Sequence, residues 1–194
     1  MTGDVSPEAQ ALLRIAHANS ERLVELINNL LDIEKLETQR IAMPTERVDV
    51  RTLVTAAVEA NQAFATLHHV ELQMTGDIEA DLSVLGNPGR LQQVLANLIS
   101  NSIKFTPEGG RVEITAEASG EQVRFVVTDS GPGIPAHLLE RVFERFWQVG
   151  ADDSRGMGLG LYISRCIIVA HGGRIWAESE LGKYSAIHFT LPAA

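Results

Sequence analysis

Cysteine is nearly absent: Cys166 is the only one among 194 residues. An intrachain disulfide is therefore excluded, and the composition fits a reducing compartment. Long apolar runs are also missing, since none reaches the roughly 18 residues that a membrane-spanning helix needs. The N-terminus shows no signal-peptide pattern. We therefore expect no membrane segment in this chain and a cytoplasmic location.

Positive charge is scarce, because 16 Lys and Arg stand against 25 Asp and Glu, for a net charge of −9. Nucleic-acid binding relies on clustered Lys and Arg, so we expect no nucleic-acid partner. Apolar residues make up 45% and charged residues 21% of the chain, which is ordinary for a globular protein. At about 150 residues per domain, the length predicts one full domain and a small additional element.

The first forty residues predict one long amphipathic helix. Ser6 and Pro7 are typical of a helix start, and no Pro or Gly follows between Glu8 and about Gln39. Apolar side chains recur at steps of three and four residues, as in a helical bundle: Leu23, Leu26, Leu30, Ile33 and Leu36. Such a helix cannot bury this stripe alone, so we expect it to need a partner helix.

Strand and helix patterns alternate after Pro44. Helical patterns cover residues 52–67, 88–105, 136–146 and 159–170. Strand patterns cover residues 48–50, 70–74, 82–85, 112–118, 123–127, 174–179 and 185–191. These patterns predict an α+β fold, a two-layer α/β sandwich with a mixed sheet and helices on one face, preceded by the long helix. We place the boundary between residues 1–43 and 44–194.

A polar stripe lies on the predicted helix 88–105. Gln93, Asn97, Asn101 and Lys104 are spaced by four, four and three residues, which puts them on one face. Amide oxygens suit a hard cation such as Mg²⁺, and a Lys ammonium suits phosphate. The alternative is an ordinary solvated helix face.

Two glycine-containing segments are candidates for ligand contact. Asp129 directly follows a buried strand, where its carboxylate can accept a hydrogen bond from an exocyclic amine such as that of adenine. Gly131 and Gly133 then allow close backbone approach, although the segment taken alone favours a strand-to-helix turn with a capping Asp. The segment 156–161 opens a helix and offers amides to an anion, but it fits neither the P-loop nor the dinucleotide motif.

An aromatic segment precedes the second glycine segment. Phe143 and Phe146 lie within residues 142–147. We expect both to be hydrophobic anchors that also pack in the core.

The ordered set of motifs resembles bacterial sensor histidine kinases. Residues 97–106 are similar to their N box, 129–135 to the G1 box, 143–146 to the F box and 156–161 to the G2 box. The order and the separations are those of the family. The long N-terminal helix resembles the second helix of the dimerisation and histidine-phosphotransfer hairpin, so the resemblance covers nearly the whole chain.

This resemblance implies the ATP-binding α/β sandwich that histidine kinases share with gyrase B, the Hsp90 chaperones and MutL. It implies that Asp129 binds the adenine amine, that Asn97 coordinates Mg²⁺, and that Asn101 and Lys104 contact phosphate. Further nucleotide contacts are implied at Phe105, Gly131, Gly133, Ile134, Gly156, Gly158, Leu159 and Gly160. The residues expected to serve catalysis are Asn97, Lys104, Gln93 and Arg145.

Several positions depart from the family pattern. Met157 stands where Thr is usual, Ser102 where Ala is common, and Gln148 where Arg is frequent. The lid expected between residues 148 and 157 is short and contains Asp152 and Asp153. We expect these departures to slow turnover more than they weaken nucleotide binding.

The phosphoacceptor motif of the family is missing, because none of the six histidines lies in a His-Glu/Asp-Leu-Arg sequence. His17 is on the long helix, but its neighbours do not resemble that motif. The chain thus resembles a C-terminal piece of a kinase, which should bind Mg-ATP without phosphorylating itself.

The parent protein is expected to be a homodimer, with any membrane anchor lying upstream of this chain. It should transfer the γ-phosphoryl group of ATP to a histidine on the absent upstream helix, and from there to the aspartate of a response-regulator receiver domain. Two alternatives are a non-catalytic phosphotransfer or scaffold module of the same fold and an anti-sigma-type serine kinase. The intact N and G1 residues argue against the first, and the long helix argues against the second.

Overall fold

The computed structural model describes residues 6–37, 44–148 and 157–194. Its elements are α1 (Pro7–Glu37), β1 (Glu46–Asp49), α2 (Val50–Leu67), β2 (Glu71–Met74), β3 (Ser83–Gly86), α3 (Pro88–Phe105), β4 (Arg111–Ser119), β5 (Gln122–Asp129), the 3₁₀ turns η1 (Ala136–Leu138) and η2 (Arg141–Phe143), α4 (Gly160–Ala170), β6 (Arg174–Glu180) and β7 (Tyr184–Pro192). In those ranges, no helix combines the length and apolarity that crossing a membrane requires.

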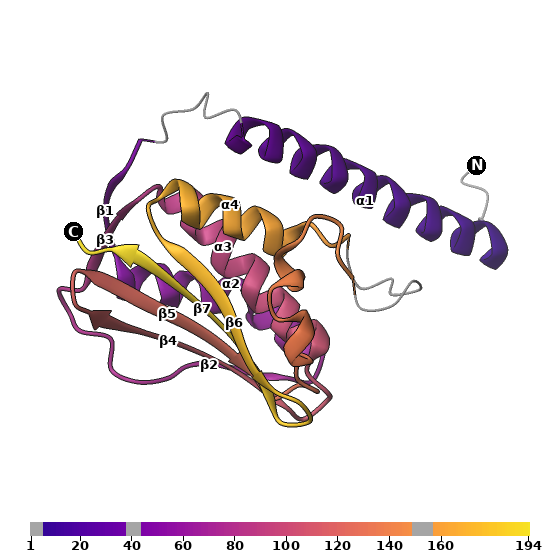
Figure 1. Ribbon diagram of the computed structural model, residues 1–194. Coiled ribbons are helices and arrows are strands. Elements are labelled where there is room, and N and C mark those ends of the chain that lie inside the picture. Colours follow the sequence, from indigo (N-terminus) through magenta and orange to yellow (C-terminus); the bar gives the residue numbers. More distant parts are fainter. Residues whose placement is uncertain (1–5, 38–43, 149–156) are drawn as a thin grey trace.

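A five-stranded mixed sheet forms one layer of the molecule. Its strand order is β2-β4-β5-β7-β6, in which β2 and β4 are parallel and the other neighbours antiparallel. Helices α2, α3 and α4 cover one face of this sheet (Figure 1). The predicted two-layer sandwich is thereby confirmed. Strands β1 and β3 form a separate two-stranded sheet, which the sequence patterns did not distinguish from the main one.

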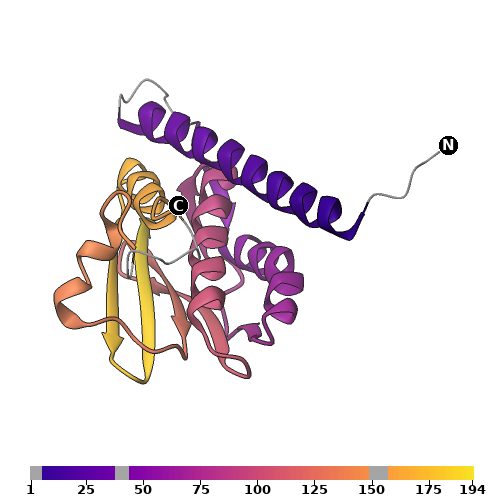
Figure 2. The same ribbon diagram turned by 90° about the vertical axis from the view of Figure 1, so that its right-hand side faces the viewer.

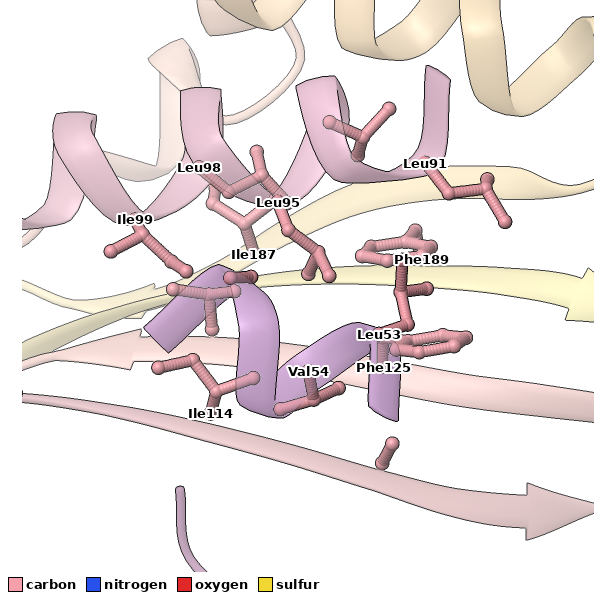
Figure 3. Packing of buried hydrophobic residues seen from close by; sticks show 14 of the residues in the cluster. Leu53, Val54, Leu91, Leu95, Leu98, Ile99, Ile114, Phe125, Ile187 and Phe189 are labelled. Carbon is pink, nitrogen blue, oxygen red and sulfur yellow. The ribbon is translucent and has the colours of Figure 1, made fainter. Parts of the chain in front are cut away.

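The core lies between the helices and the sheet. Figure 3 shows part of it, and its labelled side chains come from α2, α3, β4, β5 and β7: Leu53, Val54, Leu91, Leu95, Leu98, Ile99, Ile114, Phe125, Ile187 and Phe189. The rings of Phe125 and Phe189 stack with their centres 4.5 Å apart. Each such buried side chain contributes about 1.5–3 kcal/mol of hydrophobic stabilisation. The apolar side of α3 is therefore firmly held, which fixes where its polar side points.

The predicted helix over residues 136–146 is wrong. Only the short turns η1 and η2 form there, and Phe146 adopts a left-handed φ of +62°. The Phe146 amide donates to the carbonyl oxygen of Gly158 at 2.9 Å, a contact between distant parts of the chain. Because a bulky residue rarely adopts positive φ, tertiary contacts have overridden the local helical preference.

Helix α1 contacts α4 and crosses it at an angle (Figures 1 and 2). Near its C-terminal end, Ile33 is 1% exposed and Leu26 packs against the core. Most of the remaining apolar stripe is exposed: Leu12, Leu13, Ile15, Leu23, Val24, Ile27, Leu30 and Leu31. The α4 contact therefore satisfies only part of the stripe, in line with the expected need for a partner helix. The domain boundary after residue 43 stays a prediction.

A buried histidine lies in the sheet. His188 on β7 stacks on Trp176 with ring centres 5.1 Å apart, and its Nε2 lies 3.6 Å from a carboxylate oxygen of Glu178. Neither ring nitrogen has a hydrogen-bond partner among the described residues. Burial lowers the pKa of His188; the Glu178 charge opposes this shift, and the Arg124 charge adds to it.

This pKa shift predicts a pH-dependent stability. The unfolded chain binds a proton at His188 more tightly than the folded chain does. The contribution of neutral His188 to the free energy of unfolding is therefore fully present above a pH of about 6.5 and is lost as the pH falls. We expect His188→Gln to reduce the loss of unfolding free energy between about pH 7.5 and pH 5, measured by denaturant titration. The exposed His137→Gln is the control, and identical pH slopes for all three proteins would contradict this assignment.

Candidate functional site

Helix α3 carries the polar stripe. The helix begins where the Asn87 side chain accepts a hydrogen bond from the Arg90 amide at 3.0 Å, with Pro88 in the first turn. Apolar residues on its other side are buried against the sheet. The four stripe residues are half-buried: Gln93, Asn97, Asn101 and Lys104.

The middle of this stripe meets the start of α4. The Asn97 side-chain amide donates to the Gly160 carbonyl oxygen at 3.3 Å. A Cβ built on Gly160 would lie 3.6 Å from Asn97 Cγ and 3.7 Å from Asn101 Nδ2. Since Asn97 uses its amino group in this bond, its Oδ1 is the atom left to meet a cation. Amide oxygens beside a helix N-terminus fit a Mg²⁺–phosphate group by their donor chemistry.

A buried carboxylate lies next to the C-terminal end of α3. Asp129, the last residue of β5, is 6% exposed and accepts a hydrogen bond from the Gly131 amide at 2.9 Å. Burial raises the pKa of the Asp129 carboxyl, while hydrogen bonds from Gly131, Ser102 and Ser185 oppose this rise. The carboxylate is therefore an acceptor held in a pocket with little water, which suits recognition of an amine.

Two glycines after Asp129 sit where a side chain would not fit. A Cβ on Gly131 would lie 2.6 Å from the Asp129 carboxylate and 3.0 Å from the Phe105 carbonyl oxygen. Gly133 has a φ of +76°, and a Cβ there would lie 2.6 Å from the Glu180 carbonyl oxygen. The loop between β5 and η1 is thus packed between the end of α3 and the turn that joins β6 to β7.

The aromatic segment, residues 142–147, contacts Gly158 of the second glycine segment. Gly158 has a φ of +68°, and a Cβ there would overlap the Trp147 carbonyl oxygen. Phe143 is buried, as predicted for a core anchor. Phe146 is 55% exposed, with the Arg145 guanidinium 5.1 Å from the centre of its ring, so the prediction that it packs in the core is wrong. Its left-handed backbone, held by the bond to Gly158, turns the ring outward.

The remaining predicted residues lie at different places. Gln93 accepts a hydrogen bond from Arg90 at 2.8 Å, one turn before Asn97 on α3, whereas Arg145 lies beside Phe146. Leu159 is buried directly before α4. Gly156 and most of the expected lid fall outside the described residues. The roles of Gln93 and Arg145 therefore stay predictions.

Three serines in the site were not predicted to act there. Ser102 and Ser185 lie beside the Asp129 carboxylate, where both oppose the rise of its pKa, and the Ser179 hydroxyl accepts from the Ile134 amide at 2.7 Å. For two of these serines, the sequence pattern indicated a role. Ser102 lies on the otherwise apolar side of α3, and Ser185 takes an inward position at the start of β7. A buried hydroxyl needs a partner, so each marks a nearby polar group.

The chain was compared with known proteins. Residues 86–194 match the family model for the histidine kinase-, DNA gyrase B- and HSP90-like ATPases. The chain is 34% identical over 188 residues to the adaptive-response sensory kinase SasA of Thermosynechococcus vestitus. This alignment covers 95% of the chain and 49% of SasA, so the chain spans about half the length of this curated relative.

Solved structures give the same result. Full-length ShkA in complex with AMPPNP matches with a TM-score of 0.84 and 30% identity, over 99% of this chain and 40% of ShkA. Histidine kinase ThkA in complex with the response regulator protein TrrA matches with a TM-score of 0.77 and 28% identity, over 98% of this chain and 53% of that one. The fold, the residues of α3 and these relatives agree: the chain belongs to the histidine kinase-, DNA gyrase B- and HSP90-like ATPases, and within them to the histidine kinases.

Proposed function

We propose that this chain binds Mg-ATP between α3, the loop after β5 and the start of α4. The observation that carries the proposal is that α3 reaches both ends of one site. Asn97 bonds to Gly160 at the start of α4. At the C-terminal end of α3, the Phe105 carbonyl oxygen packs against Gly131, two residues after Asp129, where a Cβ would lie only 3.0 Å away. A single rigid helix thus sets the distance between a group suited to phosphate and Mg²⁺ and a group suited to a base amine.

Each side chain then has a defined role. The Asp129 carboxylate accepts the hydrogen bond of the adenine amine, and Gly131 and Gly133 let the backbone approach the base. Asn97 would hold Mg²⁺, whose charge, when bound, offsets that of the phosphates. Asn101 and Lys104 contact phosphate oxygens. Phosphoryl transfer depends mainly on positioning and charge neutralisation, which these residues can supply.

Further contacts belong to the same proposal. Phe105 and Ile134 flank the base, while Gly158, Leu159 and Gly160 bring backbone amides near the phosphates. Gly160 is the first residue of α4, where helix amides point outward.

We further propose that the parent protein donates the γ-phosphoryl group to a histidine on an upstream helix, for relay to a response-regulator aspartate. The ThkA complex with TrrA supports a response-regulator partner. The exposed apolar stripe of α1 supports pairing with another helix and a homodimeric parent. A cytoplasmic location belongs to this proposal, because ATP and response regulators are found there.

Nucleotide titration tests the proposed function. Calorimetry with AMPPNP should show one site per chain, with tighter binding when Mg²⁺ is present. Asn97→Ala should weaken Mg-AMPPNP binding about tenfold or more, since it removes a ligand to a charged group. The same variant should change the affinity much less in EDTA. Asn19→Ala, at an exposed position on α1, is the matched control.

Two results would contradict the proposal. Absence of AMPPNP binding by the folded wild-type chain would favour the scaffold alternative. Incubation of the isolated chain with γ-labelled ATP should leave it unlabelled. Acid-labile, base-stable label on this chain alone would show that an acceptor histidine lies within it.

A further inference from the structure

The end of the β6–β7 hairpin is bonded to the loop that follows Asp129. The Ile134 amide donates to the Ser179 hydroxyl at 2.7 Å, and the Gly182 amide donates to the Pro132 carbonyl oxygen at 2.7 Å. Ser185 is also the register partner of Asp129 across β7 and β5. One short hairpin end therefore contacts the segment from Asp129 to Ile134 at three successive places.

Ser179 has a fixed orientation within this contact. Its hydroxyl donates to the Tyr184 carbonyl oxygen at 2.6 Å, which closes the end of the hairpin. The hydroxyl hydrogen is thereby used, and the oxygen lone pairs point toward the Ile134 amide. Ser179 is also the register partner of Ser185 across the two strands. A single half-buried hydroxyl thus joins both strands of the hairpin to the loop.

Packing makes the same contact rigid. A Cβ on Gly133 would lie 2.6 Å from the Glu180 carbonyl oxygen and 2.8 Å from Leu181 Cα, so the two backbones already touch. The loop cannot move toward the hairpin, and the two hydrogen bonds of Ile134 and Pro132 oppose movement away from it. Its position relative to Asp129 is therefore set by the hairpin.

We propose that Ser179 is a positioning residue for recognition of the base, a role that rests on the proposed nucleotide function. Asp129 accepts a hydrogen bond from an amine, so a base with a carbonyl at that place meets the carboxylate with like polarity. This discrimination requires that the loop hold the base against the carboxylate. Removing the Ser179 hydroxyl leaves the Ile134 amide without this acceptor and loosens the loop at the far side of the base.

The test compares two nucleotides in competition. Binding of Mg-AMPPNP and Mg-GMPPNP is measured by displacement of a fluorescent ATP analogue from the wild type and three variants. We expect Ser179→Ala to weaken AMPPNP binding about tenfold and GMPPNP binding much less, so that the preference for adenine falls. Ser179→Thr retains the hydroxyl and should restore the preference. Ser119→Ala, at the exposed end of β4, should match the wild type.

The possible outcomes are distinct. An unchanged AMPPNP-to-GMPPNP ratio in a folded Ser179→Ala chain would overturn the positioning role, even if both affinities fell together. Failure of Ser179→Thr to restore the ratio would also overturn it. If the wild type binds neither the fluorescent analogue nor AMPPNP, the proposed nucleotide function itself is wrong. Thermal unfolding of each variant verifies that the compared chains are folded.

Discussion

Asp129→Asn is expected to weaken Mg-AMPPNP binding about 100-fold or more and to leave the chain folded. In the proposed complex the carboxylate accepts a charge-assisted hydrogen bond from the amine, and such bonds contribute about 1.5–3 kcal/mol. The amide of Asn can in addition turn its own amino group toward the amine, which places donor against donor. Calorimetric titration of wild type and variant measures the difference, with the exposed Asp81→Asn as the matched control.

The same substitution has a second expected effect, on stability. Burial raises the pKa of Asp129 in the folded chain, so the folded state binds a proton more tightly than the unfolded state. The resulting stabilisation is present below the unfolded pKa and is lost as the pH rises through the folded value. At neutral pH the ionised carboxylate therefore opposes folding, and Asp129→Asn should melt at the same temperature as the wild type or higher. A strongly lowered melting temperature would show that Asp129 is needed for the fold.

Gly173→Ala is expected to cause a large loss of stability. Gly173 follows α4, where its amide donates to the Ile168 carbonyl oxygen at 2.9 Å. A Cβ there would overlap the Thr190 carbonyl oxygen on β7 and lie 3.0 Å from Ile168 Cγ2. Because backbone must move to relieve this overlap, we expect a cost of about 3 kcal/mol, or a melting temperature about 6–12 °C lower.

A second glycine provides the control for this substitution. Gly89 lies in the first turn of α3, and a Cβ there would make only an ordinary contact, 3.5 Å from Asn87 Oδ1. Gly89→Ala should therefore melt close to the wild type. Thermal unfolding followed by circular dichroism compares the two variants. Equal melting temperatures for Gly173→Ala and Gly89→Ala would contradict the predicted overlap.

The sequence predicts an element well where local signals are sufficient. Helix α3 was predicted with both of its ends, because Asn87 caps its start, Pro88 begins it and the apolar period continues to Phe105. The segment 136–146 contains good helix formers but no helix, because Phe146 bonds to Gly158 and takes a left-handed conformation. That bond joins residues on either side of the expected lid, residues 148–157, and no local pattern reveals it.

The candidate site follows the same division. The Asn97 stripe and the acidic G1 segment are visible in the sequence as patterns of residue type. The sequence does not show that Asn97 lies close to Gly160, or Asp129 close to Ser102, because Asn97 and Gly160 are 63 positions apart. The prediction that these segments form one nucleotide site came from the family resemblance. It gave no role to Ser179, whose hydrogen bond to Ile134 spans 45 positions and depends on how a hairpin meets a loop.

The position of β7 in the sheet has a consequence for synthesis of the protein. Strand β7 follows β6 in the sequence, but it lies between β5 and β6 rather than at an edge of the sheet. A ribosome that has released the chain only through β6 leaves both of these strands without their shared neighbour. Asp129 then lacks Ser185, and Phe125 lacks the ring of Phe189. The proposed base pocket therefore forms only after β7 has been synthesised, and we expect a nascent chain to gain nucleotide binding only when its sheet can close.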